Sequence, residues 1–349
     1  MKKVFFSFIL LFSINSFSQK NYGIVLDKVY GVVLDGETKE PLVGASVYFN
    51  NTTLGASTNN KGEFSLYVRK KIKTPLVVSF IGYISLPKED VSVNKKLTFY
   101  LYKSNNLLNE AVINTNDGWS RNIKMNEFLK HFLGNTVNGR ACEVKNKEDV
   151  LLRYNKTTKQ LTAQSDVPII VKNPNLGFLI SVELKHFEVN YSYVSKNNKT
   201  RTFDKTYYSS TNFFKSVDES LKTINKRKKT YKGSLLHFMR ALSKNKLLRN
   251  GYELDEEGHY RNIYTKFVNP KRYIEIQETD SLGVKVHLKR KLKIVYKNGG
   301  RSMVESLVDA FFIDSFGNHS PIDKVIFEGD LGNQRIGDTL PLDFLLKNK

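Results

Sequence analysis

The alternation of apolar and polar residues predicts short strands in the first third of the chain. Residues 63–68 alternate between the two kinds, which places Phe64, Leu66 and Val68 on one face of an extended segment. The other strand-like runs are 29–34, 45–49 and 76–81, with turn residues at 35–38 and 59–62 between them. We therefore expect an all-β unit over residues 27–103.

Apolar residues at steps of three and four predict helices farther along the chain. Residues 125–133 carry such a stripe, and Gly134 directly after it is typical of a helix end. Two more stripes predict a helical pair; their members are Phe214, Val217, Leu221 and Ile224, and then Leu235, Phe238, Met239 and Leu242. Strand-like runs fill much of the remaining chain, at 150–154, 161–163, 167–171, 178–190 and again after 260.

Residues 285–297 predict one long strand with two unlike faces. The apolar side carries Val286, Leu288, Leu292, Ile294 and Tyr296 together with Arg290, and the other side carries Lys285, His287, Lys289, Lys291, Lys293 and Lys297. Side chains on one face of a strand repeat about every 6.6–6.8 Å, a spacing that suits a linear polyanion. The alternative is an exposed sheet edge that lysines protect against pairing with other chains.

These patterns predict a mainly β fold, with a β-sandwich first and an α+β part after it that contains the helical pair and antiparallel strands. The polar residues near position 115 indicate a boundary between the two parts. The expected segments are a signal peptide over 1–18, the sandwich over 27–103, a linker over 104–122 and the α+β domain over 123–349.

Charge and the N-terminus bear on where such a protein acts. The 349 residues contain 55 Lys and Arg against 34 Asp and Glu, a formal net charge of +21 that favours anionic partners. The N-terminus has the order of an export signal: Lys2 and Lys3 come first, a short apolar run follows, and small residues precede Gln19. The apolar run is too short to span a membrane. The single cysteine, Cys142, has no partner for an intramolecular disulfide, which favours a bacterial envelope over a eukaryotic exterior.

Four motifs in order carry a family resemblance. They are 31–35 (GVVLD), 40–47 (EPLVGASV), 55–64 (GASTNNKGEF) and 78–83 (VSFIGY). This series resembles the carboxypeptidase-like regulatory domain of secreted and outer-membrane proteins of Bacteroidota, which implies a transthyretin-like β-sandwich. The segments 168–178 and 231–242 resemble a second module of exported Bacteroidota proteins, which has no known activity to carry over.

The family's name does not imply peptidase activity for this chain. A zinc carboxypeptidase needs a histidine followed three residues later by a glutamate, and none of the six histidines has one. Ser234 and His237 lie one turn apart on a predicted helix, but Ser234 is better explained as its N-cap. We expect no catalytic residue, no metal and no cofactor.

The sequence therefore favours a non-catalytic exported protein that acts in binding or assembly. Its expected partners are an anionic envelope polymer, such as lipopolysaccharide or an acidic glycan, or an acidic protein, with contact at the outer-membrane periphery included. Nucleic acid is disfavoured because the aromatic residues fall in core positions. The candidate binding residues are Lys226, Arg227, Lys229, His237, Arg240, Lys285, Lys289, Lys291 and Lys293. The alternative is a periplasmic or secreted polymer hydrolase with its site in the C-terminal domain.

Overall fold

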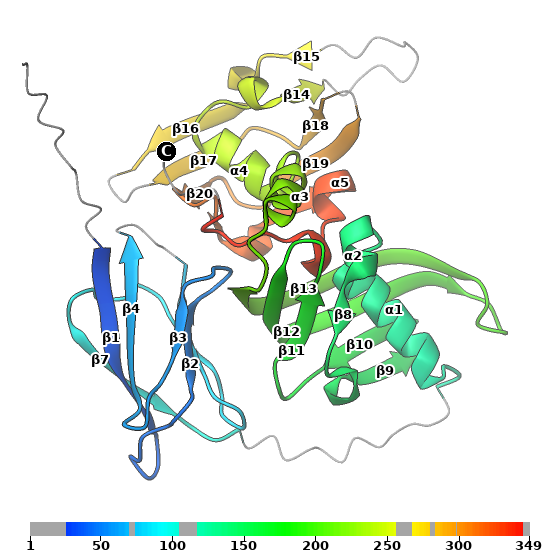
Figure 1. Ribbon diagram of the computed structural model, residues 1–349. Coiled ribbons are helices and arrows are strands. Elements are labelled where there is room, and N and C mark those ends of the chain that lie inside the picture. The colour runs from blue at the N-terminus through cyan, green and yellow to red at the C-terminus, as the bar shows by residue number, and fades with distance from the viewer. Residues whose placement is uncertain are drawn as a thin grey trace, which may run out of the picture.

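A computed structural model describes residues 26–69, 74–104, 117–255, 267–279, 283–297 and 299–344 (Figure 1). The expected signal peptide and most of the expected linker lie outside the described residues. Among the helices that are described, none has the length and apolar character needed to cross a membrane.

The first part of the chain is a sandwich of two sheets. One sheet has the order β4-β1-β7, from Glu63–Arg69, Leu26–Asp35 and Lys96–Leu101. The other has the order β3-β2-β5-β6, from Gly55–Ser57, Ser46–Phe49, Leu76–Ser79 and Leu86–Lys88. Val29, Val47 and Leu76 are fully buried between the sheets. The predicted strands are thus confirmed, although the turn over 59–62 passes the chain from one sheet to the other.

Glycines are required where the sandwich chain turns or packs closely. Gly62 has a φ of +70°, and an added Cβ would lie 2.6 Å from the Val33 carbonyl oxygen. A Cβ at Gly31 would lie 2.1 Å from the Leu97 carbonyl oxygen, where β1 runs parallel to β7. Only glycine meets both conditions without a shift of the backbone.

The middle of the chain forms a sheet built on a long hairpin. The hairpin is β12 and β13, Phe178–Val194 and Arg201–Ser216. The sheet has the order β8-β11-β12-β10-β9, with β13 also paired to β12; the other strands are Glu143–Val144, Ile169–Asn173, Gln160–Gln164 and Leu151–Asn155. Helix α1, Arg121–Leu133, packs on this sheet through Phe128 and Phe132, and it ends at Gly134 as predicted. The short α2 is Val137–Ala141.

The last part of the chain holds helices α3, Leu221–Tyr231, and α4, Leu235–Ser243, together with two antiparallel sheets. The first has the order β15-β14-β18-β19-β22, from Phe267–Val268, Tyr252–Asp255, Leu292–Tyr296, Gly300–Ser306 and Val325–Glu328. The second has the order β16-β17-β20-β21, from Ile274–Glu278, Gly283–Leu288, Phe311–Asp314 and His319–Ser320. Helix α4 contributes Phe238, Met239 and Leu242 to the core that these sheets share, and α5 is Gly329–Gly332.

The predicted fold class, a mainly β chain with an N-terminal sandwich followed by an α+β part, is confirmed. Two local predictions are wrong. Phe214 belongs to β13, so the helix predicted from it begins only at Leu221. The strand predicted over 285–297 is two strands, β17 and β18, in different sheets.

The sandwich docks on the rest of the molecule through the loop after β2. Thr52 makes a parallel bridge with Phe213 of β13, and the Asn51 amide donates to the Asn212 carbonyl at 2.7 Å. The Thr53 amide donates to Asp343 near the end of the described chain, at 3.0 Å. Figure 1 shows the sandwich beside the hairpin and below the C-terminal sheets.

Candidate functional site

Helix α3 separates its charged residues into two groups. Ser220 caps the helix by accepting the Thr223 amide at 3.3 Å. Arg227 points inward and is 4% exposed, whereas Lys228 and Lys229 are exposed. Among the predicted binding residues on this helix, Arg227 is therefore a structural cation, whereas Lys229 lies on the surface.

Arg227 holds two turns of the chain onto α3. Its guanidinium donates to the carbonyls of Leu176, Gly177 and Asp218 at 2.7–3.1 Å and to Ser216 Oγ at 2.9 Å. Glu219 accepts from its Nη1 at 3.0 Å, and the Phe178 ring lies 4.0 Å from it. Because these contacts use the donors of the fork, Arg227 is removed from the set of ligand-binding residues.

Arg240 on α4 has a comparable structural role. It is 5% exposed and donates to three backbone carbonyls at 2.7–2.8 Å. The carbonyls belong to Phe316, Leu342 and Phe344. Arg240 therefore fastens the end of the described chain to α4, and it too is removed from the predicted binding set.

His237 is a buried, neutral side chain. Its Nδ1 accepts from the Gly233 backbone amide at 3.1 Å, and the Tyr252 hydroxyl oxygen lies 3.1 Å from the same nitrogen. Its Nε2 lies 3.2 Å from Asn250 Oδ1, so Nε2 carries the proton. Burial lowers the pKa of His237, and the nearby Arg240, Lys297 and Lys232 lower it further. The histidine thus organises the wall of a cavity without adding charge to it.

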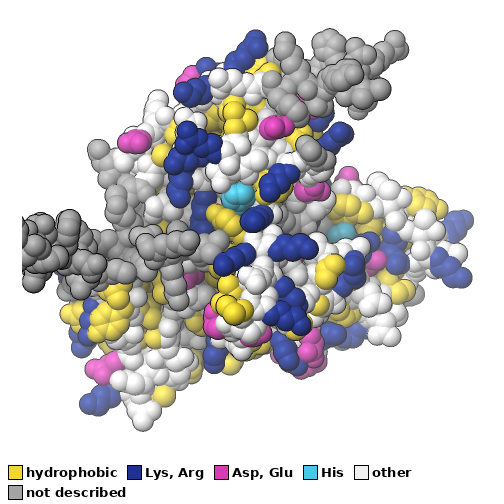
Figure 2. Space-filling model, turned by 45° about the horizontal axis from the view of Figure 1, so that its top comes forward, with side chains coloured by type: hydrophobic (Ala, Val, Ile, Leu, Met, Phe, Trp, Pro, Cys, Tyr) yellow, Lys and Arg dark blue, Asp and Glu magenta, His cyan; other side chains and the backbone are white. Residues whose placement is uncertain are grey.

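That cavity, here named the basic cavity, has a volume of about 580 Å³. Its lining is Lys228, Tyr231, Lys232, His237, Leu248, Arg249, Asn250, Gly251, Tyr296 and Lys297. Four of these side chains are exposed cations, Lys228, Lys232, Arg249 and Lys297, and none of the described lining residues is acidic. Figure 2 shows Lys and Arg side chains gathered on this side of the molecule around a histidine.

A second hollow, here named the helix-side cavity, meets the first at Lys232, which lines both. Its volume is about 700 Å³, and it contains the predicted Lys226 and Lys229. Lys226 Nζ donates to Asn175 Oδ1 at 2.7 Å. This hollow also holds Asp330 and Asp338, so its charge is mixed.

The lysines of 285–297 are divided between two sheets and largely paired. Lys289 lies 2.5 Å from Glu275, Lys291 lies 2.8 Å from Glu328, and Lys293 lies 2.9 Å from Asp255. Lys285 is exposed on β17. The predicted row of lysines along one strand face is therefore absent, because the chain bends at 289–291 and crosses between sheets.

Of the residues that line the basic cavity, only His237 was among the predicted binding residues. The four cations of the cavity were not among them, and neither were Asn250 and Tyr296. Tyr296 occupies an apolar position in the strand pattern, and its ring lies 5.9 Å from that of His237. Arg249 and Asn250 come from a short turn after α4 that carries no periodic signal. In the sequence, only the positive charge of Arg249 could have indicated it.

The described contacts do not assemble a hydrolytic site. Ser234 Oγ accepts the His237 backbone amide at 3.1 Å, which confirms the predicted N-cap, while the His237 ring is bonded elsewhere. Asp255 is paired with Lys293. Within the described ranges, no group of three His, Cys, Asp or Glu residues could hold a metal ion.

Comparisons with known proteins identify the first part of the chain. Residues 29–113 match the family model described as CarboxypepD_reg-like domain, so the chain carries this domain, as its four motifs predicted. No curated protein matches the chain. Among solved structures it is similar to a "putative carbohydrate binding protein from Bacteroides uniformis", at 10% identity and a TM-score of 0.18, over 52% of this chain and 98% of that chain. A TM-score this low carries no argument about ligand or fold.

Proposed function

We propose that this protein is a non-catalytic, exported binding protein whose basic cavity holds an acidic residue of an envelope glycan. The observation that carries the proposal is the basic cavity itself, in which four exposed cations surround a hollow whose described lining includes no acid. Cations brought together in this way repel one another, and an anion placed between them relieves that repulsion.

The uncharged lining residues favour a sugar over a simple ion. Tyr231 and Tyr296 present aromatic surface, and Asn250 adds an amide beside His237. Ligand cavities combine apolar surface with a few placed polar groups, and aromatic rings offer a flat surface to a sugar ring. A volume of about 580 Å³ is in the range of small-molecule sites.

A polymer would extend from the basic cavity into the helix-side cavity. Lys232 lines both hollows, and Lys226 and Lys229 lie beyond it. Asn138 and Asn175 supply further amides along that path. The N-terminal CarboxypepD_reg-like domain fits such a binding role and would hold the α+β part in place. Export rests on the expected signal at residues 1–18.

Binding of polygalacturonate tests this proposal, with neutral dextran as the matched uncharged polymer. At 50 mM salt, we expect calorimetry to detect binding of polygalacturonate and no binding of dextran. The affinity for polygalacturonate should fall at least ten-fold at 500 mM salt, because salt screens exposed charges within about 10 Å. The double variant Lys228→Glu/Lys232→Glu should lose at least ten-fold in affinity. The control variant Lys205→Glu/Lys285→Glu changes the net charge by the same amount at two exposed lysines outside both cavities, and it should change the affinity by less than about two-fold.

Three results would contradict the proposal. Equal losses in the two double variants would mean that net charge alone attracts the polymer. Binding that is unchanged at 500 mM salt would mean that the lysines do not carry it. Tight binding of lipopolysaccharide or an acidic protein with no response to polygalacturonate would replace the glycan by one of those partners.

A further inference from the structure

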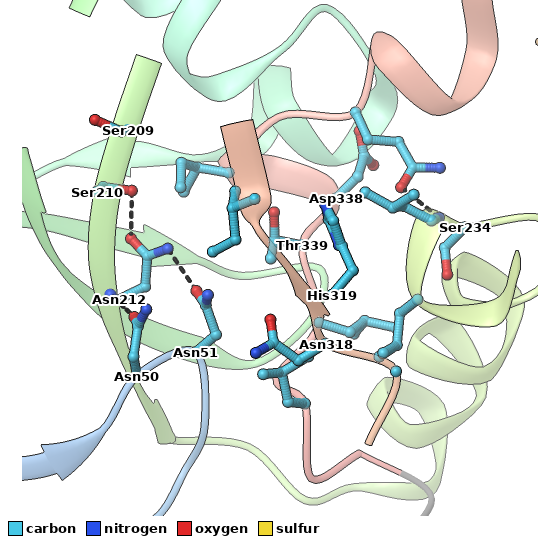
Figure 3. Close-up of a pocket in the computed structure, with 18 of the residues that line it drawn as sticks. Asn50, Asn51, Ser209, Ser210, Asn212, Ser234, Asn318, His319, Asp338 and Thr339 are labelled. Carbon is cyan, nitrogen blue, oxygen red and sulfur yellow. Dashed lines mark hydrogen bonds between the residues drawn. The ribbon is translucent and has the colours of Figure 1, made fainter. Parts of the chain in front are cut away.

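One edge of strand β13 borders a cavity between the sandwich, the hairpin and the C-terminal part. This junction cavity has a volume of about 550 Å³, and Tyr207, Tyr208, Ser209, Ser210 and Asn212 all line it. Figure 3 shows the strand that carries Ser209, Ser210 and Asn212 along one side of the cavity. Successive side chains of a strand point to opposite faces of its sheet, so one face alone cannot supply the consecutive lining residues 207–210. The edge of β13, with its backbone, therefore faces the junction cavity.

The sandwich already pairs with the neighbouring part of this edge. The Asn51 backbone amide donates to the Asn212 carbonyl at 2.7 Å, and the Phe214 amide donates to the Thr52 carbonyl at 3.0 Å. Thr52 also forms a parallel bridge with β13. The loop after β2 thus lies along β13 as an added strand does, and the junction cavity continues this interface along the same edge.

These contacts fix which backbone groups of β13 point away from β12. In an antiparallel pair, groups that face the partner strand and groups that face away alternate along the chain. Asn212 and Phe214 direct theirs away, and the bulge in this stretch adds a residue to β12 and none to β13, so Tyr208 and Ser210 direct theirs away too. Among the residues that the structure describes, none bonds to the backbone amides or carbonyls of Tyr208 and Ser210 on that side. Such unpaired edge groups are a template for pairing with another chain.

Apolar side chains form much of the remaining wall of the junction cavity. Four of them are each less than 10% exposed: Leu236, Leu331, Ile336 and Leu340. Among the described lining residues there is no lysine or arginine. Asp338 lines the cavity, but its carboxylate oxygens already accept from Thr136 at 2.8 Å and from Asn138 at 3.0 Å. The wall therefore favours an uncharged occupant with apolar side chains.

We propose that the junction cavity binds an extended, uncharged peptide segment of another protein, which pairs with β13 at Tyr208 and Ser210 as an added strand. Amides and carbonyls that recur at every second residue are matched by another extended backbone. A sugar or a lipid tail has no such row of donors and acceptors. Apolar side chains at alternate positions of the added strand would pack against the leucine-rich wall.

The peptide acetyl-Ser-Leu-Ser-Leu-Ser-Leu-Ser-amide tests this proposal by calorimetry with the full-length protein. It is long enough for the edge between Tyr207 and Asn212, which spans about 17 Å at about 3.3 Å per residue. Two matched peptides carry N-methyl groups, one on the three leucine amides and the other on three of the serine amides. We expect one of them to bind at least ten-fold more weakly than the parent and the other less than about three-fold more weakly, because only alternate amides of an added strand face β13. No binding of the parent, or equal affinities of the two methylated peptides, overturns the proposal.

Hydrogen exchange measured by NMR locates the pairing on the protein itself. At saturation with the parent peptide, the backbone amides of Tyr208 and Ser210 should exchange at least ten-fold more slowly, because carbonyls of the added strand accept them. The amides of Tyr207 and Ser209 face β12 and should change by less than about two-fold. Unchanged exchange at Tyr208 and Ser210, or equal slowing at 207–210, overturns the proposal. Slowing that grows with protein concentration in the absence of peptide would place a second copy of this chain on the edge instead.

The variant Ser210→Pro removes one of the outward donors. An edge strand tolerates proline where the lost N–H points away from the sheet. Ser210→Ala is the matched control, because it also loses the hydroxyl that donates to Asn212 Oδ1 at 3.0 Å but keeps the backbone amide. We expect Ser210→Pro to weaken binding of the parent peptide at least ten-fold and Ser210→Ala to change it less than about two-fold; equal effects overturn the proposal. If Ser210→Pro does not fold, the exchange measurement on the unaltered protein decides.

Discussion

At the scale of single residues, burial decides which charged groups can meet a ligand. Arg227 and Arg240 are each about 5% exposed, and their guanidinium groups donate hydrogen bonds to backbone carbonyls. Lys228 and Lys232 are exposed to solvent. In the sequence, Lys228 and Lys232 belong to the same basic stretch as Arg227, and Arg240 follows eight residues after Lys232. Nothing in the spacing separates them, because each position depends on turns that pack against the helices from distant parts of the chain.

The buried histidines make stability depend on pH. The pKa of His319 is about 4 in the folded chain, below the ordinary value of 6.5. The unfolded chain therefore binds this proton more readily, so the full contribution is present above about pH 6.5 and is lost as pH falls toward 4. We expect the free energy of unfolding to drop by about 2 kcal/mol between pH 7.5 and 5 from this group.

Urea unfolding at several pH values measures this slope. His237, whose pKa is also lowered, adds to the loss in the same direction. Asp338 acts in the opposite direction, because burial raises the pKa of its carboxyl. His319→Phe should flatten the slope between pH 6.5 and 5, and a slope identical to that of the unaltered protein would show that the His319 pKa is ordinary.

At the scale of elements, regular periodicity predicted strands and helices well, but it did not predict where the chain bends. The strands of the sandwich and helix α1 were predictable because each keeps one period over its whole length. Residues 285–297 also keep one period, yet the chain breaks at Lys289 and Arg290 and enters a second sheet. Alternation of apolar residues fits both cases, because it records which side faces a core and not which core.

Arg227 fastens α3 to the turns at 176–177 and 216–219, so its loss should be costly. We expect Arg227→Met to lower the free energy of unfolding by about 3 kcal/mol, because buried carbonyls would lose their donors. Lys228→Met, one residue along and exposed, is the control and should stay within about 0.5 kcal/mol. Equal effects in chemical denaturation would refute a structural role for Arg227.

At the scale of the whole molecule, the sandwich and the α+β part share an interface of backbone and amide hydrogen bonds. The contacts centre on Asn50, Asn51 and Thr52 against Asn212 and Phe213. Neither the family motifs nor the periodicity of the sandwich predicted this docking, since the loop after β2 is polar and irregular. The cavities could not be predicted from the sequence either, because they lie between elements whose packing the periodicity does not specify.

Asn212→Leu should loosen this docking while both parts stay folded. The hydrogen bond from the Asn212 side chain to the Asn51 side chain is lost. The backbone amide of Asn51, which donates to the Asn212 carbonyl, should then exchange its hydrogen about ten-fold faster. Hydrogen exchange read at residues 49–54 measures the effect. Lys205→Leu, on the same strand but away from the interface, should leave exchange unchanged; faster exchange in both variants would point to a general loss of stability.

The contact between Thr53 and Asp343 joins residues 290 positions apart. A ribosome makes the two ends of this contact at very different times, so the sandwich is complete long before its docking partner exists. Closing such a long loop is slow compared with forming local structure. The cavity between the sandwich and the C-terminal part, whose wall runs from Asn50 to Leu342, is therefore among the last features to form. It is complete only after Leu342 has been made and has docked.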